Sequence, residues 1–220
     1  MTIISNRLPN IQLIGIHGHA GVGKDTIGNY LCTRYEKTYS EAFASPLKEA
    51  CSEAFGMSLG NFNDPELKDT IDPYWKLTPR KILQFLGTEV FRSQISKFVE
   101  IPEGDFWLHR MHGRLIGELV RDHRDGIYED EDTVIITDVR FQNEYEYITQ
   151  NGGWIIHLLR PGHEGKVGIA GHTSESGVEI TAPEVTYLID NRGTLEELYE
   201  KVETFITNSE LNLSIKPDQE

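Results

Sequence analysis

The sequence predicts an α/β fold in which a parallel β-sheet carries helices on both faces. Mostly apolar runs at 11–18, 133–139 and 154–160 are typical of strands that are buried in such a sheet. Segments with helical periodicity stand between these runs, and the alternation of strands and helices is the pattern of a parallel sheet. The first run leads directly into the glycine-rich segment "GHAGVGKDT" (18–26), which opens a helix.

The first half of the chain begins with a buried strand that ends at a glycine. The expected elements are, in order, a strand at 11–18, a helix at 24–37, a short strand at 41–44 and a helix at 45–56. Ser45 is the predicted N-cap of that last helix, Pro46 stands in its first turn, and Gly56 ends it. Residues 57–77 are rich in turn residues and predict an irregular insertion.

Two further helices follow the insertion, at 78–95 and 105–124, and Thr78 is the predicted cap of the first. The remaining elements are a strand at 133–139, a helix at 140–153, a strand at 154–160, a strand at 185–190 and a helix at 194–206 capped by Thr194. The glycine-rich segment 161–177 predicts a lid. The polar tail at 208–220 is expected to fray, so residues 1–207 form the folded domain.

Composition narrows the function classes. The 220 residues are 38% hydrophobic and 25% charged, which predicts a soluble globule, and no apolar run is long enough to span a bilayer. Cys32 and Cys51 show no partner pattern, so a disulfide framework or zinc cluster is not expected and a reducing cytoplasm fits. The net charge of −14 argues against a nucleic-acid polymer as the main ligand, although a single nucleotide needs only a local positive pocket.

The glycine-rich segment is a phosphate-binding pattern with one departure. Gly18, Gly23 and Lys24 satisfy G-x-x-x-x-G-K, but the next position is Asp25 where Ser or Thr is usual. Backbone N–H groups of such a loop surround phosphate oxygens, and the lysine bridges the terminal phosphates. A tight strand-to-helix turn is the alternative interpretation; it explains the glycines but not Lys24.

Charged residues leave the other strands at the edge where ligands bind in parallel sheets. Asp138 ends one strand and suits outer-sphere Mg²⁺ binding, or equally the N-cap of the next helix. Arg140 and Arg160 leave two separate strands, and together they favour an anion site over two surface ion pairs.

These cations favour a phosphate as the acceptor group. A phosphate monoester is already an anion near neutral pH, so its transfer reaction needs positioning and positive charge more than a general base. Lys24, Arg80, Arg92, Arg140 and Arg160 stand in suitable places, and no Ser-His-Asp or Cys-His arrangement competes with them. The segment His17-Gly18-His19 does not by itself predict a metal site.

Several segments together resemble the deoxynucleoside monophosphate kinases of tailed bacteriophages. The matching motifs are "GKDT" (23–26), "FASPLKEA" (43–50), "TPRKILQFLGTEVFR" (78–92), "TDVRFQNEYE" (137–146), "HTSE" (172–175) and "IDNRGTLEEL" (189–198). They run from the first strand to the last helix, and their order and spacing are more specific than any one of them. The resemblance implies a P-loop kinase fold with an inserted helical, acceptor-binding lobe at 57–125, and transfer of the γ-phosphate of ATP to a deoxynucleoside monophosphate with Mg²⁺.

The resemblance also implies roles for individual residues. It places Lys24, Arg140 and Asp25 in catalysis, with Asp25 as a family variant that holds Mg²⁺ together with Asp138. The ATP-binding residues it implies are Gly18, Gly21, Val22, Gly23, Lys24, Asp25, Thr26, Arg160 and Asn191. Those for the acceptor are Lys48, Arg80, Arg92, Asp138, Arg140 and Glu144, the last on the acceptor or on Arg140 unless it is an ordinary exposed helix carboxylate.

Three other functions remain open at this stage. A P-loop kinase for a non-nucleotide small molecule would share the loop, and a DNA-processing ATPase would share it too, although the acidic charge argues against DNA. A GTPase switch would need D-x-x-G and N-K-x-D, where this chain has "DVRF" and "DNRG". The expected location is the cytoplasm, that of the host if the gene is a phage gene, and a homodimer is left open.

Overall fold

A computed structural model describes residues 8, 11–119, 132–162, 177–209, 211 and 213–217. From Ile3 onward the chain divides into two compact units. The first, here called the sheet unit, consists of Ile3–Ala42 and His112–Glu220, and the second, the helical unit, is Phe43–Met111. The helical unit, at 43–111, therefore begins and ends earlier in the chain than the inserted lobe expected at 57–125.

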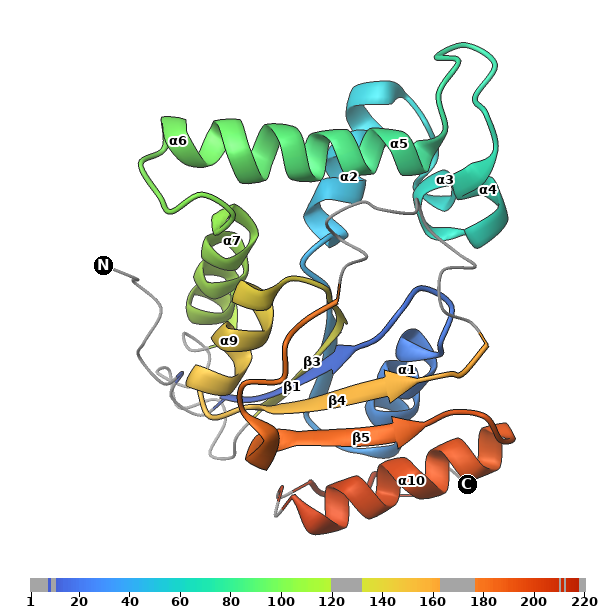
Figure 1. The fold of residues 1–220 in the computed structure, drawn as a ribbon, viewed down its shortest axis with the longest axis vertical. Helices are drawn as coiled ribbons and strands as arrows, with labels where there is room; N and C mark the ends of the chain where they lie inside the picture. The colour runs from blue at the N-terminus through green and yellow to red at the C-terminus, as the bar shows by residue number, and fades with distance from the viewer. Residues whose placement is uncertain are drawn as a thin grey trace. The chain divides into compact units, whose positions relative to one another are not determined.

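The sheet unit is built on five parallel strands in the order β2-β3-β1-β4-β5 (Figure 1). The strands are β1 (Ile11–His17), β2 (Thr38–Glu41), β3 (Asp132–Val139), β4 (Trp154–Leu159) and β5 (Thr186–Asp190). The prediction of a parallel sheet is confirmed. Since β1 lies in the middle, the loop that follows it emerges between the ends of β3 and β4.

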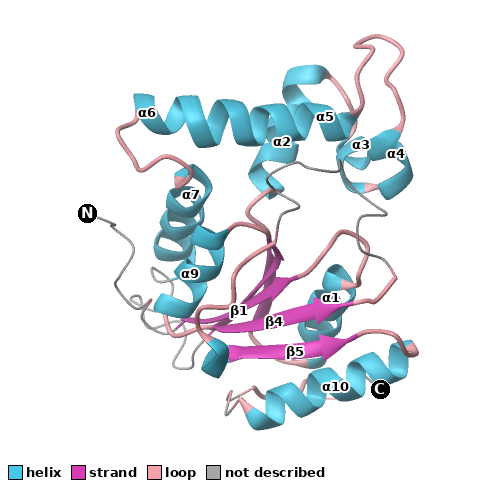
Figure 2. Cartoon of the chain, in the orientation of Figure 1, coloured by secondary structure: helices cyan, strands magenta, loops and turns pink. Residues whose placement is uncertain are grey.

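Helices cover both faces of this sheet, as the sequence predicts (Figure 2). Ile14 and Ile16 of β1 belong to one apolar cluster with residues of α1 (Lys24–Arg34) and α10 (Leu195–Asn208). Gly15 points the other way, where a Cβ would meet Ile148 of α9 (Gln142–Gln150) at 2.6 Å. Alternate residues of β1 thus pack against different helices, which explains why the run is apolar on both faces.

The last helix and the tail close the sheet unit. The Thr194 hydroxyl accepts from the Glu197 N–H at 3.3 Å and the Glu197 carboxylate accepts from the Thr194 N–H at 3.1 Å, which confirms the predicted cap. The expected fraying of the tail is wrong for residues 213–217. The Glu36 N–H donates to the Ser214 carbonyl at 2.8 Å, and backbone hydrogen bonds therefore hold this segment beside the end of α1.

The short strand expected at 41–44 is misplaced. The strand is β2 (Thr38–Glu41), and only Glu41 belongs to both. Phe43, which gave the segment its strand-like pattern, is buried in the helical unit just before α2 (Ser45–Phe55). Ala44, and not Ser45, is the N-cap of α2, whereas Pro46 and Gly56 take their predicted places.

The helical unit contains more helix than the sequence pattern indicates. Its further elements are α3 (Leu59–Asn63), α4 (Pro65–Asp69), α5 (Pro79–Gln84), the π-helical segment η1 (Phe85–Ile95), α6 (Ser96–Phe98) and most of α7 (Phe106–Arg114). Two short helices thus occupy the first part of the segment 57–77, and residues 70–77 are irregular as expected. The Asp64 carboxylate accepts from the N–H groups of Glu66 and Leu67, a local start signal that the weak periodicity concealed.

The helix expected at 78–95 starts as predicted, but its hydrogen-bonding pattern changes. The Thr78 hydroxyl accepts from the Lys81 N–H at 3.3 Å, as a helix cap does. From Phe85 onward the segment is a π-helix, a form that apolar periodicity does not reveal. After α7 a second π-helical segment, η2, covers Leu115–Leu119; the rest of the helix expected to reach residue 124 lies outside the described residues.

Cys32 and Cys51 are both free thiols. Among the residues that the structure describes, none of the helices has the length and apolar character needed to cross a bilayer.

We predict that the close approach of β4 to β1 does not tolerate a side chain at Gly153. A Cβ there would lie 2.7 Å from the Leu13 carbonyl oxygen and 2.8 Å from the Ile148 side chain. Gly153→Ala should lower the free energy of unfolding by about 1–3 kcal/mol in urea denaturation, because a backbone carbonyl has little room to move. Gly113→Ala is the matched control: a Cβ at this exposed position in α7 meets nothing within 4 Å, so stability should hold or rise. Equal effects of the two substitutions would contradict this packing.

Candidate functional site

The glycine-rich loop connects β1 to α1 through backbone that only glycine adopts readily. Gly18, Gly21 and Gly23 have φ angles of 153°, 79° and 106°. A Cβ at Gly18 would also collide with the Leu158 carbonyl oxygen of β4, so the loop lies directly against the neighbouring strand. Within the described chain no side chain caps α1 at Gly23. The start of a helix is a usual place for an anion, because its first N–H groups point along the helix axis.

Lys24 closes this loop. Its side chain is buried, and Nζ donates to the carbonyl oxygens of Gly18 at 2.7 Å and His19 at 2.8 Å. A buried ammonium group is stable only with such partners, so the lysine and the loop hold each other in place. The positive charge is thereby fixed at the mouth of α1.

Two carboxylates lie at the same edge of the sheet. Asp25 is exposed in the first turn of α1, where a negative charge interacts favourably with the helix dipole. Asp138 is half-buried near the end of β3, which pairs with β1. The N-cap of α9 is Phe141, so of the two interpretations of Asp138 the helix cap is excluded.

Glu144 fixes the turn that follows Asp138. Its side chain is only 1% exposed, and Oε2 accepts from the backbone N–H of Arg140 at 2.8 Å and of Phe141 at 3.1 Å. The alternative of an ordinary exposed helix carboxylate is therefore wrong. A carboxylate at the third position of α9 satisfies N–H groups at the helix start, and it sets the backbone from which the Arg140 side chain extends.

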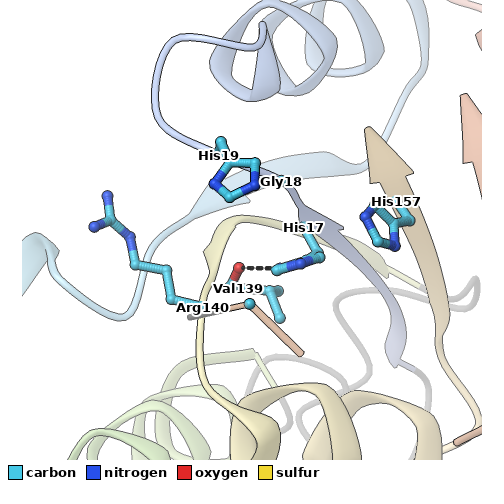
Figure 3. Close-up of a pocket in the computed structure, with 7 residues that line it drawn as sticks. His17, Gly18, His19, Val139, Arg140 and His157 are labelled. Atoms are coloured by element: carbon cyan, nitrogen blue, oxygen red, sulfur yellow. Dashed lines mark hydrogen bonds between the residues drawn. The ribbon is translucent and has the colours of Figure 1, made fainter. Parts of the chain in front are cut away.

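A pocket opens beside the loop on the α9 side of the sheet (Figure 3). Its lining residues are His17, Gly18, His19, Val139, Arg140, His157 and Gly177. The structure thus brings together in one pocket two residues of the site predicted from the strand ends, Gly18 and Arg140. Arg160 is exposed just after β4, and most of the predicted lid, 163–176, lies outside the described residues.

The pocket contains a histidine pair that the sequence analysis missed. His17 of β1 and His157 of β4 are partners in the parallel register, and their rings meet edge to face at 4.8 Å. His17 Nδ1 lies 2.9 Å from the Val139 carbonyl oxygen, to which it donates. Burial lowers the pKa of His17 to about 4, and burial also lowers the pKa of His157. Only the pairing of β1 with β4 reveals the two histidines as a pair, because this register places His17 and His157 side by side.

Asn191 also supports the loop. It follows β5, its N–H donates to the Leu159 carbonyl at 2.7 Å, and Nδ2 donates to the Val22 carbonyl at 2.9 Å. The side-chain amide therefore contacts the phosphate-binding loop itself. Whether Asn191 also lies near a bound adenine stays a prediction.

Three of the cations expected to bind the acceptor, Lys48, Arg80 and Arg92, belong to the helical unit. Arg80 forms a forked ion pair with Asp69, at 2.6 Å from Nε and 3.0 Å from Nη2, and this arginine lowers the pKa of Asp69. Arg92 is buried and donates to the Gly104 carbonyl at 2.8 Å. Lys48 is half-buried on α2. These contacts hold each arginine in one orientation within its unit.

The fold and the loop together define a class: an α/β protein with a phosphate-binding loop after the central strand of a parallel sheet. The model of the family described as deoxynucleotide monophosphate kinase matches residues 66–202. The chain is also 34% identical over 203 residues to a protein of Acanthamoeba polyphaga mimivirus that bears the family's name, with 90% of this chain and 97% of the relative covered. The chain belongs to the deoxynucleotide monophosphate kinase family, and the resemblance seen in the sequence is confirmed.

Two phage proteins named deoxynucleotide monophosphate kinase are more distant. The one from Escherichia phage RB69 is 28% identical, covering 70% of this chain and 50% of its own, and the one from Enterobacteria phage T4 is 25% identical, covering 61% and 46%. The chain thus spans about half the length of these two relatives. A crystal structure of a sugar kinase from Janibacter sp. HTCC2649 aligns over 90% of this chain and 95% of its own, with a TM-score of 0.42 and 14% identity. At these values the alignment gives no information on a shared activity.

We predict that His17 makes the protein sensitive to acid. Its pKa is about 4 in the folded chain and about 6.5 when unfolded, so the unfolded state takes up the proton first as the pH falls. The stability that the neutral ring contributes is complete above pH 6.5 and is lost as the pH falls towards 4. Between pH 7 and 5 the wild type should lose about 2 kcal/mol more than His17→Asn in urea denaturation.

The exposed residue His19 supplies the matched control, His19→Asn, which should follow the wild type across this pH range. Identical pH profiles for the wild type and His17→Asn would show that His17 is not a buried neutral ring.

Proposed function

We propose that the protein transfers the γ-phosphoryl group of ATP to a deoxynucleoside monophosphate, giving ADP and the deoxynucleoside diphosphate. The observation that carries the proposal is the pairing of the loop closed by Lys24 with Arg140, both at the carboxyl edge of the central strands. Membership of the deoxynucleotide monophosphate kinase family supports it.

ATP would occupy the loop from Gly18 to Thr26, with its phosphates on the first N–H groups of α1. Lys24 would exchange its bonds to the carbonyls of Gly18 and His19 for bonds to the terminal phosphates. Val22 and Gly23 would be held in shape by Asn191, and Arg160 would lie beside the phosphates. Thr26, half-buried in the first turn of α1, would offer its hydroxyl to them.

The acceptor would bring a second anion to the same edge. Repulsion between the acceptor phosphate and ATP is the main obstacle, and fixed positive charge reduces it without a general base. Arg140 would contact the acceptor phosphate, while Glu144 would act on the backbone that carries Arg140. The family resemblance also implies Lys48, Arg80 and Arg92 for the acceptor, and Arg80 would have to share or exchange Asp69 to bind an anion.

The residues at this edge fit a Mg²⁺ ion that is bound mainly by substrate phosphates and water. Mg²⁺ in kinases is usually held by one or two carboxylates, and Asp25 and Asp138 supply two oxygen-donor side chains. When bound, Mg²⁺ would neutralise part of the charge on the phosphates of ATP.

We predict that purified protein forms ADP from ATP with at least one deoxynucleoside monophosphate in a panel of dAMP, dGMP, dCMP, dTMP and their ribose counterparts. Lys24→Met should lower kcat by about 100-fold or more, because a fixed donor to the transferred phosphate is lost. Lys97→Met, which removes an exposed lysine paired with Glu103 at 3.4 Å, is the control and should retain activity.

The same assay separates the other functions. ADP formation that requires a non-nucleotide acceptor would favour a small-molecule kinase, and ADP formation that requires DNA would favour a DNA-processing ATPase. Either result, with the nucleotide panel inactive, would contradict the proposal.

We predict that Asp25 takes part in Mg²⁺ use. Asp25→Ala should require at least about tenfold more Mg²⁺ for half-maximal rate, because Mg²⁺ is held in such sites by only one or two carboxylates. Asp25→Ser, which places the usual hydroxyl after Lys24, should restore part of the rate. The measurement is the rate against Mg²⁺ concentration at saturating ATP. An unchanged Mg²⁺ profile and rate in Asp25→Ala would exclude Asp25 from the metal site.

A further inference from the structure

We propose that His17 is a positioning residue for the acceptor phosphate: through the Val139 carbonyl it fixes the turn from which Arg140 extends. The proposal rests on the proposed function of Arg140 as the contact for that phosphate. It concerns a residue of β1 that the phosphate-binding motif does not include.

The pairing of β1 with β3 is irregular next to His17. Residues from Ile11 to Gly15 pair in step with Asp132 to Ile136, but His17 pairs with Val139. Ile16 of β1 therefore stands opposite two residues of β3, Thr137 and Asp138, so β3 carries one extra residue between Ile136 and Val139, just ahead of Arg140. Such a bulge interrupts the ladder of backbone hydrogen bonds and re-aims the side chains that follow. The backbone here needs another support.

Two buried side chains, His17 and Glu144, supply this support. His17 Nδ1 donates to the Val139 carbonyl at 2.9 Å, and the Glu144 carboxylate accepts from the N–H groups of Arg140 and Phe141 at 2.8 and 3.1 Å. The backbone of three consecutive residues, 139–141, is thus hydrogen-bonded to the side chains of His17 and Glu144. Both side chains are nearly inaccessible, at 7% exposed for His17 and 1% for Glu144.

His17 acts on the backbone and not on the Arg140 side chain. In Figure 3 the Arg140 side chain extends away from the His17 ring, while the hydrogen bond from that ring ends on Val139. The groups facing the ring are His157 at 4.8 Å and, further around it, Lys24 and His19. Together with burial they keep the ring neutral, and donation to a carbonyl places its hydrogen on Nδ1. A neutral ring whose Nδ1 is engaged is a poor ligand for a phosphate anion.

The consequence is specific to one substrate. Loosening the turn would spread Arg140 over several positions, which weakens the contact with the acceptor phosphate. The loop that would hold ATP keeps its own supports, namely Lys24 and the amide of Asn191. A positioning role therefore predicts that loss of His17 raises KM for the acceptor but not for ATP, whereas a general loss of folding would affect both substrates.

The test compares His17→Leu with His17→Asn. Leucine removes the donor, whereas the asparagine amide can place an N–H near the position of Nδ1. We expect His17→Leu to raise KM for the deoxynucleoside monophosphate at least tenfold and leave KM for ATP within twofold, and His17→Asn to recover most of the difference. Equal changes in both KM values, or no recovery with asparagine, would overturn the proposal. If His17→Leu fails to fold, a His17→Asn enzyme whose two KM values stay near those of the wild type supports it, and one whose acceptor KM rises tenfold overturns it.

Arg140→Ala and the double variant distinguish failure of this proposal from failure of the proposed function. If Arg140→Ala leaves KM for the acceptor unchanged, the proposed role of Arg140 is wrong and the positioning role falls with it. If Arg140→Ala raises that KM and His17→Leu does not, the positioning role alone is wrong. If His17 acts through Arg140, the effects should be non-additive: His17→Leu should change the acceptor KM by less than twofold once Arg140 is alanine.

Discussion

A buried ammonium group at the end of the central strand is the constraint on which the site depends. Lys24 can be buried only because the carbonyls of Gly18 and His19 turn towards it, and the loop can take that shape only where glycine permits it. The closeness of Gly18 to Leu158 then requires β4 to lie beside β1. A single charge thus links the conformation of the loop to the order of the strands.

The turns around this loop are held in the same way, by buried polar side chains bonded to backbone groups. His17 holds the Val139 carbonyl, Glu144 holds two N–H groups of the β3–α9 turn, and Asn191 holds the Val22 carbonyl. Each would be costly to bury without its partner, so each bond selects one backbone conformation over its neighbours. The result is a site whose irregular segments are fixed although they lie outside the regular sheet.

The helical unit follows the same principle with arginines. Arg80 is held by a forked ion pair with Asp69, and Arg92 is buried against the Gly104 carbonyl. The chain has 21 lysines and arginines against 35 acidic residues, and these two arginines are held by specific partners. Guanidinium groups held in this way lose less freedom when they meet an anion.

The sequence by itself determined the phosphate-binding loop and the caps at Thr78 and Thr194, because each is encoded by residues close together in the chain. It also determined the parallel α/β fold and the family, because the order of elements and motifs along the chain can be read without knowing their contacts. It misplaced β2, gave no sign of the π-helical segment η1, and left Glu144 open between a site residue and an exposed carboxylate. Only the tertiary structure decided these, and only it brought His17 to Val139, 122 residues away, and to His157. Strand order and register create such contacts, and neither has a local pattern in the sequence.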